Sequence, residues 1–143
     1  MKGRRPLKAQ AGVMLIEALI AILIFAVGIL GIVGLQAVSI KQGTDARYRS
    51  DAAMLANQLI GTMWLGNRTA ASLQATYNTG NSGYNTWKTV VERALPGATT
   101  YPPTVVVDSQ GNVNIQINWL APNEPANAAP HFYIAVARPT TGN

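Results

Sequence analysis

The chain has 143 residues, a formal net charge of +5 and no cysteine. Without cysteine it has no disulfide and no thiolate metal site, and its redox compartment cannot be inferred from them. Much of the positive charge lies in a leader that contains Lys2, Arg4, Arg5 and Lys8. Residues 13–143 carry seven basic and six acidic side chains. Because phosphate contacts dominate nucleic-acid affinity, we expect no nucleic-acid partner for this nearly neutral part.

Residues 13–35 form an apolar run in which Glu17 is the single charged residue. About 20 apolar residues span a bilayer, whereas a cleavable secretory signal has an apolar core of about 7–15 residues. The run therefore predicts a single-pass membrane helix. The basic leader predicts a cytoplasmic N-terminus and a C-terminal domain on the other side of the membrane. A carboxylate near the centre of such a helix costs about 2.5–3.5 kcal/mol, so Glu17 predicts a partner of opposite charge.

The segment Gly-Val-Met-Leu-Ile-Glu at residues 12–17 resembles the class III leader motif of type IV pilins and pseudopilins. The resemblance implies that residues 1–12 are a leader peptide, which a prepilin peptidase removes by cutting between Gly12 and Val13. It also implies that the new terminus at Val13 is methylated and that Glu17 is the fifth residue of the mature chain. The family usually has Phe or Met after the cut, where this chain has valine.

Glu17 then has an obvious partner. Cleavage would create an amino group at Val13 that is mostly cationic at neutral pH. Within one helix this amine and Glu17 are separated by about 6 Å along the axis, so a neighbouring subunit displaced by one short step could place its Glu17 against the amine. Pairing offsets the desolvation of both charges, and an unpaired charge in apolar surroundings is costly. We therefore predict that Glu17 helps to set the axial register of assembled subunits.

The helical pattern continues beyond the apolar run. Residues 36–65 contain no proline, and one apolar stripe recurs at spacings of three or four, formed by Tyr48, Ala52, Leu55, Leu59 and Met63. The pattern predicts one helix over residues 13–65, with a membrane or assembly half at 13–35 and an amphipathic half at 36–66. Gly28, Gly31 and Gly34 lie near one face, and small residues so placed let membrane helices pack closely.

Residues 67–143 predict a globular head. Residues 66–86 have the composition of a loop, with one turn of helix near residues 70–76. Residues 87–95 predict a short helix, and strands are expected at 104–108, 113–119 and 132–138, the second from its strict apolar–polar alternation. The predicted fold class is α+β and pilin-like: a long N-terminal helix packed on a small antiparallel sheet of three or four strands.

Residues 28–36 and 52–60 are similar to the corresponding segments of the PilV group of minor pilins. The resemblance implies a minor pilin precursor that takes part in type IV pilus assembly, in an initiating or tip complex, and so in the adhesion and twitching motility that pili support. The resemblance also implies that the membrane is the inner membrane and that the C-terminal domain is periplasmic. The expected partners are the inner membrane, the prepilin peptidase, other minor pilins, the major pilin and a tip adhesin.

Two other functions stay open. One is a minor pseudopilin of a type II secretion system, because the N-terminal motif is common to both systems. The other is a binding module displayed on the fibre for adhesion or DNA uptake, with Tyr77, Tyr84 and Trp87 as a candidate surface. An enzyme is not expected, since no catalytic constellation, cofactor motif or metal-ligand cluster is present and His131 is the single histidine.

Overall fold

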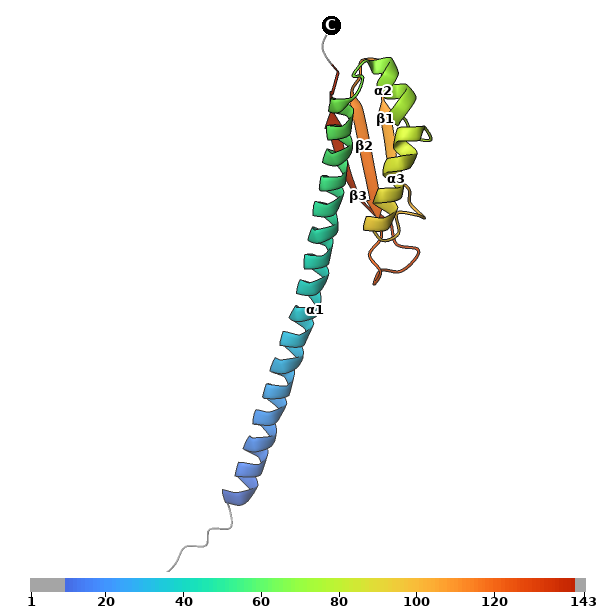
Figure 1. Ribbon diagram of the computed structural model, residues 1–143. Helices are drawn as coiled ribbons and strands as arrows, with labels where there is room; N and C mark the ends of the chain where they lie inside the picture. Colours follow the sequence, from blue (N-terminus) through green and yellow to red (C-terminus); the bar gives the residue numbers. More distant parts are fainter. Residues whose placement is uncertain (1–9, 141–143) are drawn as a thin grey trace, which may run out of the picture. The chain divides into compact units, whose positions relative to one another are not determined.

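The computed structural model describes residues 10–140 (Figure 1). The elements follow in the order α1 (Gln10–Leu65), α2 (Ala70–Tyr77), α3 (Ser82–Ala94), β1 (Thr104–Val107), β2 (Val113–Trp119) and β3 (His131–Ala137). The chain divides into two units, Met1–Gly43 and Thr44–Asn143. The predicted α+β class is confirmed, with a long N-terminal helix and a three-stranded antiparallel sheet.

In the first unit, α1 is apolar and its side chains from Gly12 to Gln36 are exposed. This is one helix near the N-terminus that is long and apolar enough to cross a membrane, by length and composition. None of the most apolar window is buried inside the protein. Exposure of so much apolar surface in water would be unfavourable, which fits a helix whose surroundings are lipid or other helices.

In the second unit, α1 buries the stripe predicted from its spacing. Ala52, Leu55, Leu59 and Met63 are each exposed by 2% or less, and Tyr48 is half-buried against the same cluster. These side chains contact a core that α2, α3 and the inner sides of the strands complete. The stripe therefore covers one face of the sheet, as an amphipathic helix on a one-sided sheet must.

The segment predicted as a loop at residues 66–86 contains more helix than expected. It includes all of α2, whose N-terminus is capped by Thr69: the Thr69 hydroxyl accepts a hydrogen bond from the Ser72 amide at 3.3 Å. It also includes the start of α3, which begins at Ser82 rather than at Trp87. The residues of this segment have loop-like composition, and the contacts of α2 with α3 and β1 stabilise the helices instead.

Gly83 lies in α3 although glycine is more common in turns than in helices. A Cβ atom there would lie 2.9 Å from the Thr76 carbonyl oxygen and 2.9 Å from the Tyr77 ring. Glycine thus permits the close approach of α3 to the end of α2, a use of the residue that has no signature in the sequence.

The sheet has the order β1-β2-β3, and both neighbouring pairs are antiparallel. The alternation predicted for β2 is confirmed: Val113, Ile115, Ile117 and Trp119 are buried, whereas the residues between them lie on the opposite face. The boundaries of β1 and β3 differ from the prediction by one residue at three of their four ends, which is an ordinary error for strand termini.

Two aromatic residues of α3 fix it to the rest of the head. The Trp87 indole N–H donates to the Leu55 carbonyl oxygen of α1 at 3.0 Å, and the Tyr84 hydroxyl donates to the Pro103 carbonyl oxygen at 2.7 Å. Burial raises the pKa of Tyr84. Both side chains belong to the core, so they do not form the exposed adhesive surface considered from the sequence.

Candidate assembly site on the apolar helix

Gly12, Val13 and Glu17, the residues of the leader motif, all lie within α1 of the first unit. Each is exposed, and among residues 10–140 no side chain forms an ion pair with Glu17. The carboxylate of Glu17 is therefore available to a group that the described part of this chain does not supply. The predicted leader at residues 1–12 lies outside the described residues except for its last three positions.

Glu17 borders a recess on one face of α1. Val13, Ile16, Glu17 and Ile20 line a shallow hollow of about 320 Å³. Their spacings of three and four residues place them on one side of the helix. The recess is mostly apolar and carries one carboxylate at its edge. It can contact an apolar surface while the carboxylate bonds a cation or a hydrogen-bond donor.

The glycines predicted to allow helix packing have open surroundings. A Cβ atom added at Gly28, Gly31 or Gly34 would meet nothing within 4 Å. The described residues of this chain therefore place nothing against these positions. Another helix has room to approach the α1 backbone closely along this part of the first unit.

Comparison with known proteins gives no relative. No model of a protein family, no curated protein and no solved structure matches the chain.

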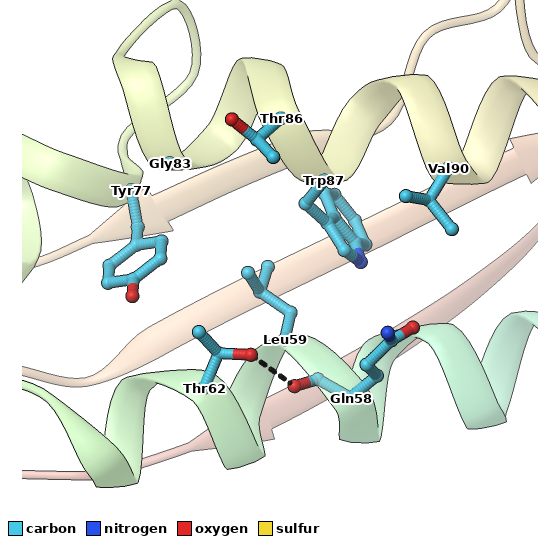
Figure 2. Close-up of a pocket in the computed structure, with 8 residues that line it drawn as sticks. All are labelled: Gln58, Leu59, Thr62, Tyr77, Gly83, Thr86, Trp87 and Val90. Atoms are coloured by element: carbon cyan, nitrogen blue, oxygen red, sulfur yellow. Dashed lines mark hydrogen bonds between the residues drawn. The ribbon is translucent and has the colours of Figure 1, made fainter.

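The second unit contains a cleft between α1 and α3 (Figure 2). Its volume is about 280 Å³, and its walls include the rings of Tyr77 and Trp87 and the side chain of Leu59. Gln58, Thr62 and Thr86 add amide and hydroxyl groups. The Thr62 hydroxyl donates to the Gln58 carbonyl oxygen at 2.9 Å, a bond dashed in Figure 2, so that hydroxyl is used within α1. The cleft holds no titratable pair that suggests a reaction.

His131 lies at the start of β3, as predicted. Its contacts with other side chains were not predicted from the sequence. Its Nε2 lies 2.9 Å from a Glu124 carboxylate oxygen, and its Nδ1 lies 3.6 Å from Asp45 of α1. Its ring stacks on Trp119 with centroids 5.7 Å apart. These contacts join β3, the loop before it and α1 within the second unit. Among residues 10–140, no group of three His, Asp or Glu side chains is arranged to hold a metal ion.

Proposed function

We propose that this chain is a minor pilin precursor that enters a type IV pilus through its N-terminal helix and helps to initiate assembly or to form the tip. The observation that carries the proposal is Glu17, a lone carboxylate on an exposed apolar helix, five residues after Gly12. An amine created at Val13 of one subunit would meet Glu17 of its neighbour, and the pairing would select one axial offset between the two helices.

Three features support a role as a subunit rather than as a plain membrane anchor. The apolar surface of α1 extends around the helix, so it can contact several neighbours. The faces around Glu17 and along the three glycines are not occupied by the described residues of the chain. The second unit packs on the same helix through a separate stripe, which leaves the apolar half free to join a bundle.

The leader prediction is tested by mass spectrometry of the protein purified from a host that has the prepilin peptidase. We expect an N-terminus at Val13 carrying one additional methyl group. Gly12→Ser is expected to leave the precursor intact, because the resemblance implies a peptidase that cuts after glycine. Gly43→Ser is a matched control, since Gly43 also lies in α1 with open surroundings. An intact leader in the unaltered chain would contradict the proposal.

The partner system is tested by deletion of the gene. Loss of surface pili, with secretion unchanged, is expected for a minor pilin. Secretion defects with normal pili would instead identify a type II secretion pseudopilin, which has the same N-terminal requirements. A binding module for DNA would show salt-dependent retention of DNA by the purified chain, and the near-neutral charge of residues 13–143 leads us to expect none.

A further inference from the structure

His131 joins three elements of the second unit through both nitrogens and one face of its ring. Nε2 lies 2.9 Å from a carboxylate oxygen of Glu124, in the loop between β2 and β3. Nδ1 lies 3.6 Å from a carboxylate oxygen of Asp45, in α1. The ring stacks on Trp119 at the end of β2, with the two ring planes inclined by 15°. The imidazole therefore lies between two carboxylates that belong to different parts of the chain.

An uncharged imidazole does not match these two neighbours. It has one N–H donor and one nitrogen lone pair, whereas both carboxylates are acceptors. With the proton on Nε2, the lone pair of Nδ1 faces Asp45; with the proton on Nδ1, the lone pair of Nε2 faces Glu124. Either arrangement places a lone pair against a negative charge. The imidazolium ion carries a proton on both nitrogens, so only the charged ring has favourable contacts with both carboxylates.

Distance and burial decide which contact the uncharged ring keeps. The separation of 2.9 Å between Nε2 and Glu124 is that of a hydrogen bond, and the Glu124 side chain is only 10% exposed, so water replaces this bond poorly. The separation of 3.6 Å between Nδ1 and Asp45 is too long for a hydrogen bond. The Asp45 side chain is 45% exposed and can be solvated instead. We therefore expect the neutral ring to keep Glu124 and to lose Asp45.

The other charged groups around the ring lie on α1. The loop before β3 contains no charged residue besides Glu124, β2 contains none, and the tyrosines of α1 and β3 ionise only in alkaline solution. Arg49 borders the same hollow as Asp45, and Lys41 and Arg49 each lie one helical turn from Asp45. Both cations oppose a positive charge on the ring. Both are exposed and screened by water, whereas Glu124 contacts the ring directly.

We propose that His131, Glu124 and Asp45 form a pH-dependent clasp between α1 and the sheet. At about pH 5.5 the charged ring binds both carboxylates and fastens α1 to β3; at about pH 8 the ring is neutral, and its contact with Asp45 opens. Asp45 is the second residue of the second unit. The clasp therefore controls how firmly the first turn of α1 in this unit is held. Neither the leader nor Glu17 takes part, so the clasp does not depend on the pilus role.

The proton positions on the ring can be observed directly, because the chain has one histidine. Nitrogen-15 spectra of the full chain, labelled at histidine and held in detergent micelles, show which ring nitrogens carry a proton. We expect a proton on both nitrogens at about pH 5.5 and on Nε2 alone at about pH 8. A proton on Nδ1 alone at about pH 8 would overturn the proposal, because the neutral ring would then have kept Asp45. This measurement needs no variant.

Urea unfolding of the full chain at the two pH values measures the contact between His131 and Asp45. The variants are Asp45→Asn, His131→Gln and the double substitution. At about pH 5.5, Asp45→Asn should lower the urea midpoint by about 0.1–1 M, the effect of an exposed ion pair. In the His131→Gln background this loss should fall to less than about half. At about pH 8, Asp45→Asn should not lower the midpoint, because an asparagine amide can donate to the lone pair of Nδ1.

Asp51→Asn is the matched control on the same helix. Asp51 lies 3.8 Å from Arg47, whose charge does not change over this pH range, so the effect of Asp51→Asn should be the same at both pH values. A loss on Asp45→Asn that is present only at about pH 5.5 and only with His131 would support the clasp. An equal loss at both pH values, or an equal loss with and without His131, would overturn it.

Discussion

Replacement of Leu59 by alanine tests whether the amphipathic half of α1 stabilises the head. Leu59 is 2% exposed in the stripe that covers the sheet. The substitution removes three carbon atoms from the core, which corresponds to about 2.4 kcal/mol of lost transfer free energy. Leu59 also borders the open cleft between α1 and α3, so water and neighbouring side chains can fill the space. We therefore expect a loss near 2–3 kcal/mol, at the lower end of the range for buried leucines.

Leu55 and Leu65 provide matched comparisons on the same helix. Leu55 is equally buried at 2% exposure but does not line the cleft, so Leu55→Ala should cost about 1 kcal/mol more than Leu59→Ala. Leu65 is 90% exposed, and Leu65→Ala should change the free energy of unfolding by less than about 0.5 kcal/mol. The order of the three costs follows from burial and from the cleft rather than from residue type.

Urea unfolding of the full chain in a mild detergent measures these values. Tryptophan fluorescence reports on the head, because Trp87 and Trp119 are 6% and 1% exposed. For an m-value of about 1–2 kcal/mol per molar urea, Leu59→Ala should lower the midpoint by about 1–3 M. A midpoint unchanged by Leu59→Ala, or lowered equally by Leu65→Ala, would refute the assignment of the stripe as the cover of the sheet.

Other substitutions address separate contacts. Gly83→Ala should destabilise the head by about 1–3 kcal/mol, because the added methyl group overpacks the contact with α2. Gly61→Ala, which has open surroundings in α1, should instead stabilise the head by about 0.5–1 kcal/mol. Equal effects of the two substitutions on the midpoint of urea unfolding would contradict the packing argument. The side-chain hydrogen bond from Asn112 holds the pKa of Asp108 below its ordinary value. Ionised Asp108 therefore stabilises the fold at pH values above its unfolded-state pKa. This contribution to stability is lost as the pH falls through the lower folded-state pKa. Asp108→Ala should therefore reduce the thermal midpoint at pH 7 and have a smaller effect at about pH 2. Under the proposed function, Glu17→Ala should permit leader cleavage but reduce recovery of the protein in sheared pili, and Glu17→Gln should behave similarly because the proposed pairing requires the charge. Normal incorporation of Glu17→Gln would remove the support for pairing with the Val13 amine.

Local periodicity predicted the parts of the fold that depend on neighbouring residues. The spacing of Tyr48, Ala52, Leu55, Leu59 and Met63 identified the buried face of α1, because residues three or four apart share one side of a helix. The alternation in β2 identified its inner face for the equivalent reason in a strand. Both patterns are properties of a short segment and need no information about distant residues.

The prediction was weakest for residues 66–86. Asn, Ser, Thr and Gly dominate this segment, and these residues favour turns as strongly as helix termini. Thr69 caps α2, and Gly83 permits α3 to approach α2. The signal at Thr69 was present in the sequence, since threonine before a helical run is a common cap. The requirement for Gly83 depends on the position of another helix and has no local signal.

The sequence by itself determined the apolar helix, its lone carboxylate at Glu17, the helical stripe and the alternating strand, since each follows from the order of side chains along one segment. Tertiary structure alone decided which edge of the sheet is closed. Thr79 bonds Val105 across 26 positions of the chain, while the backbone groups of Phe132, Ile134 and Val136 that face away from β2 receive no such bond among residues 10–140. Hydrogen bonding at an edge depends on which distant segments come together in space, and no repeat within a strand encodes it.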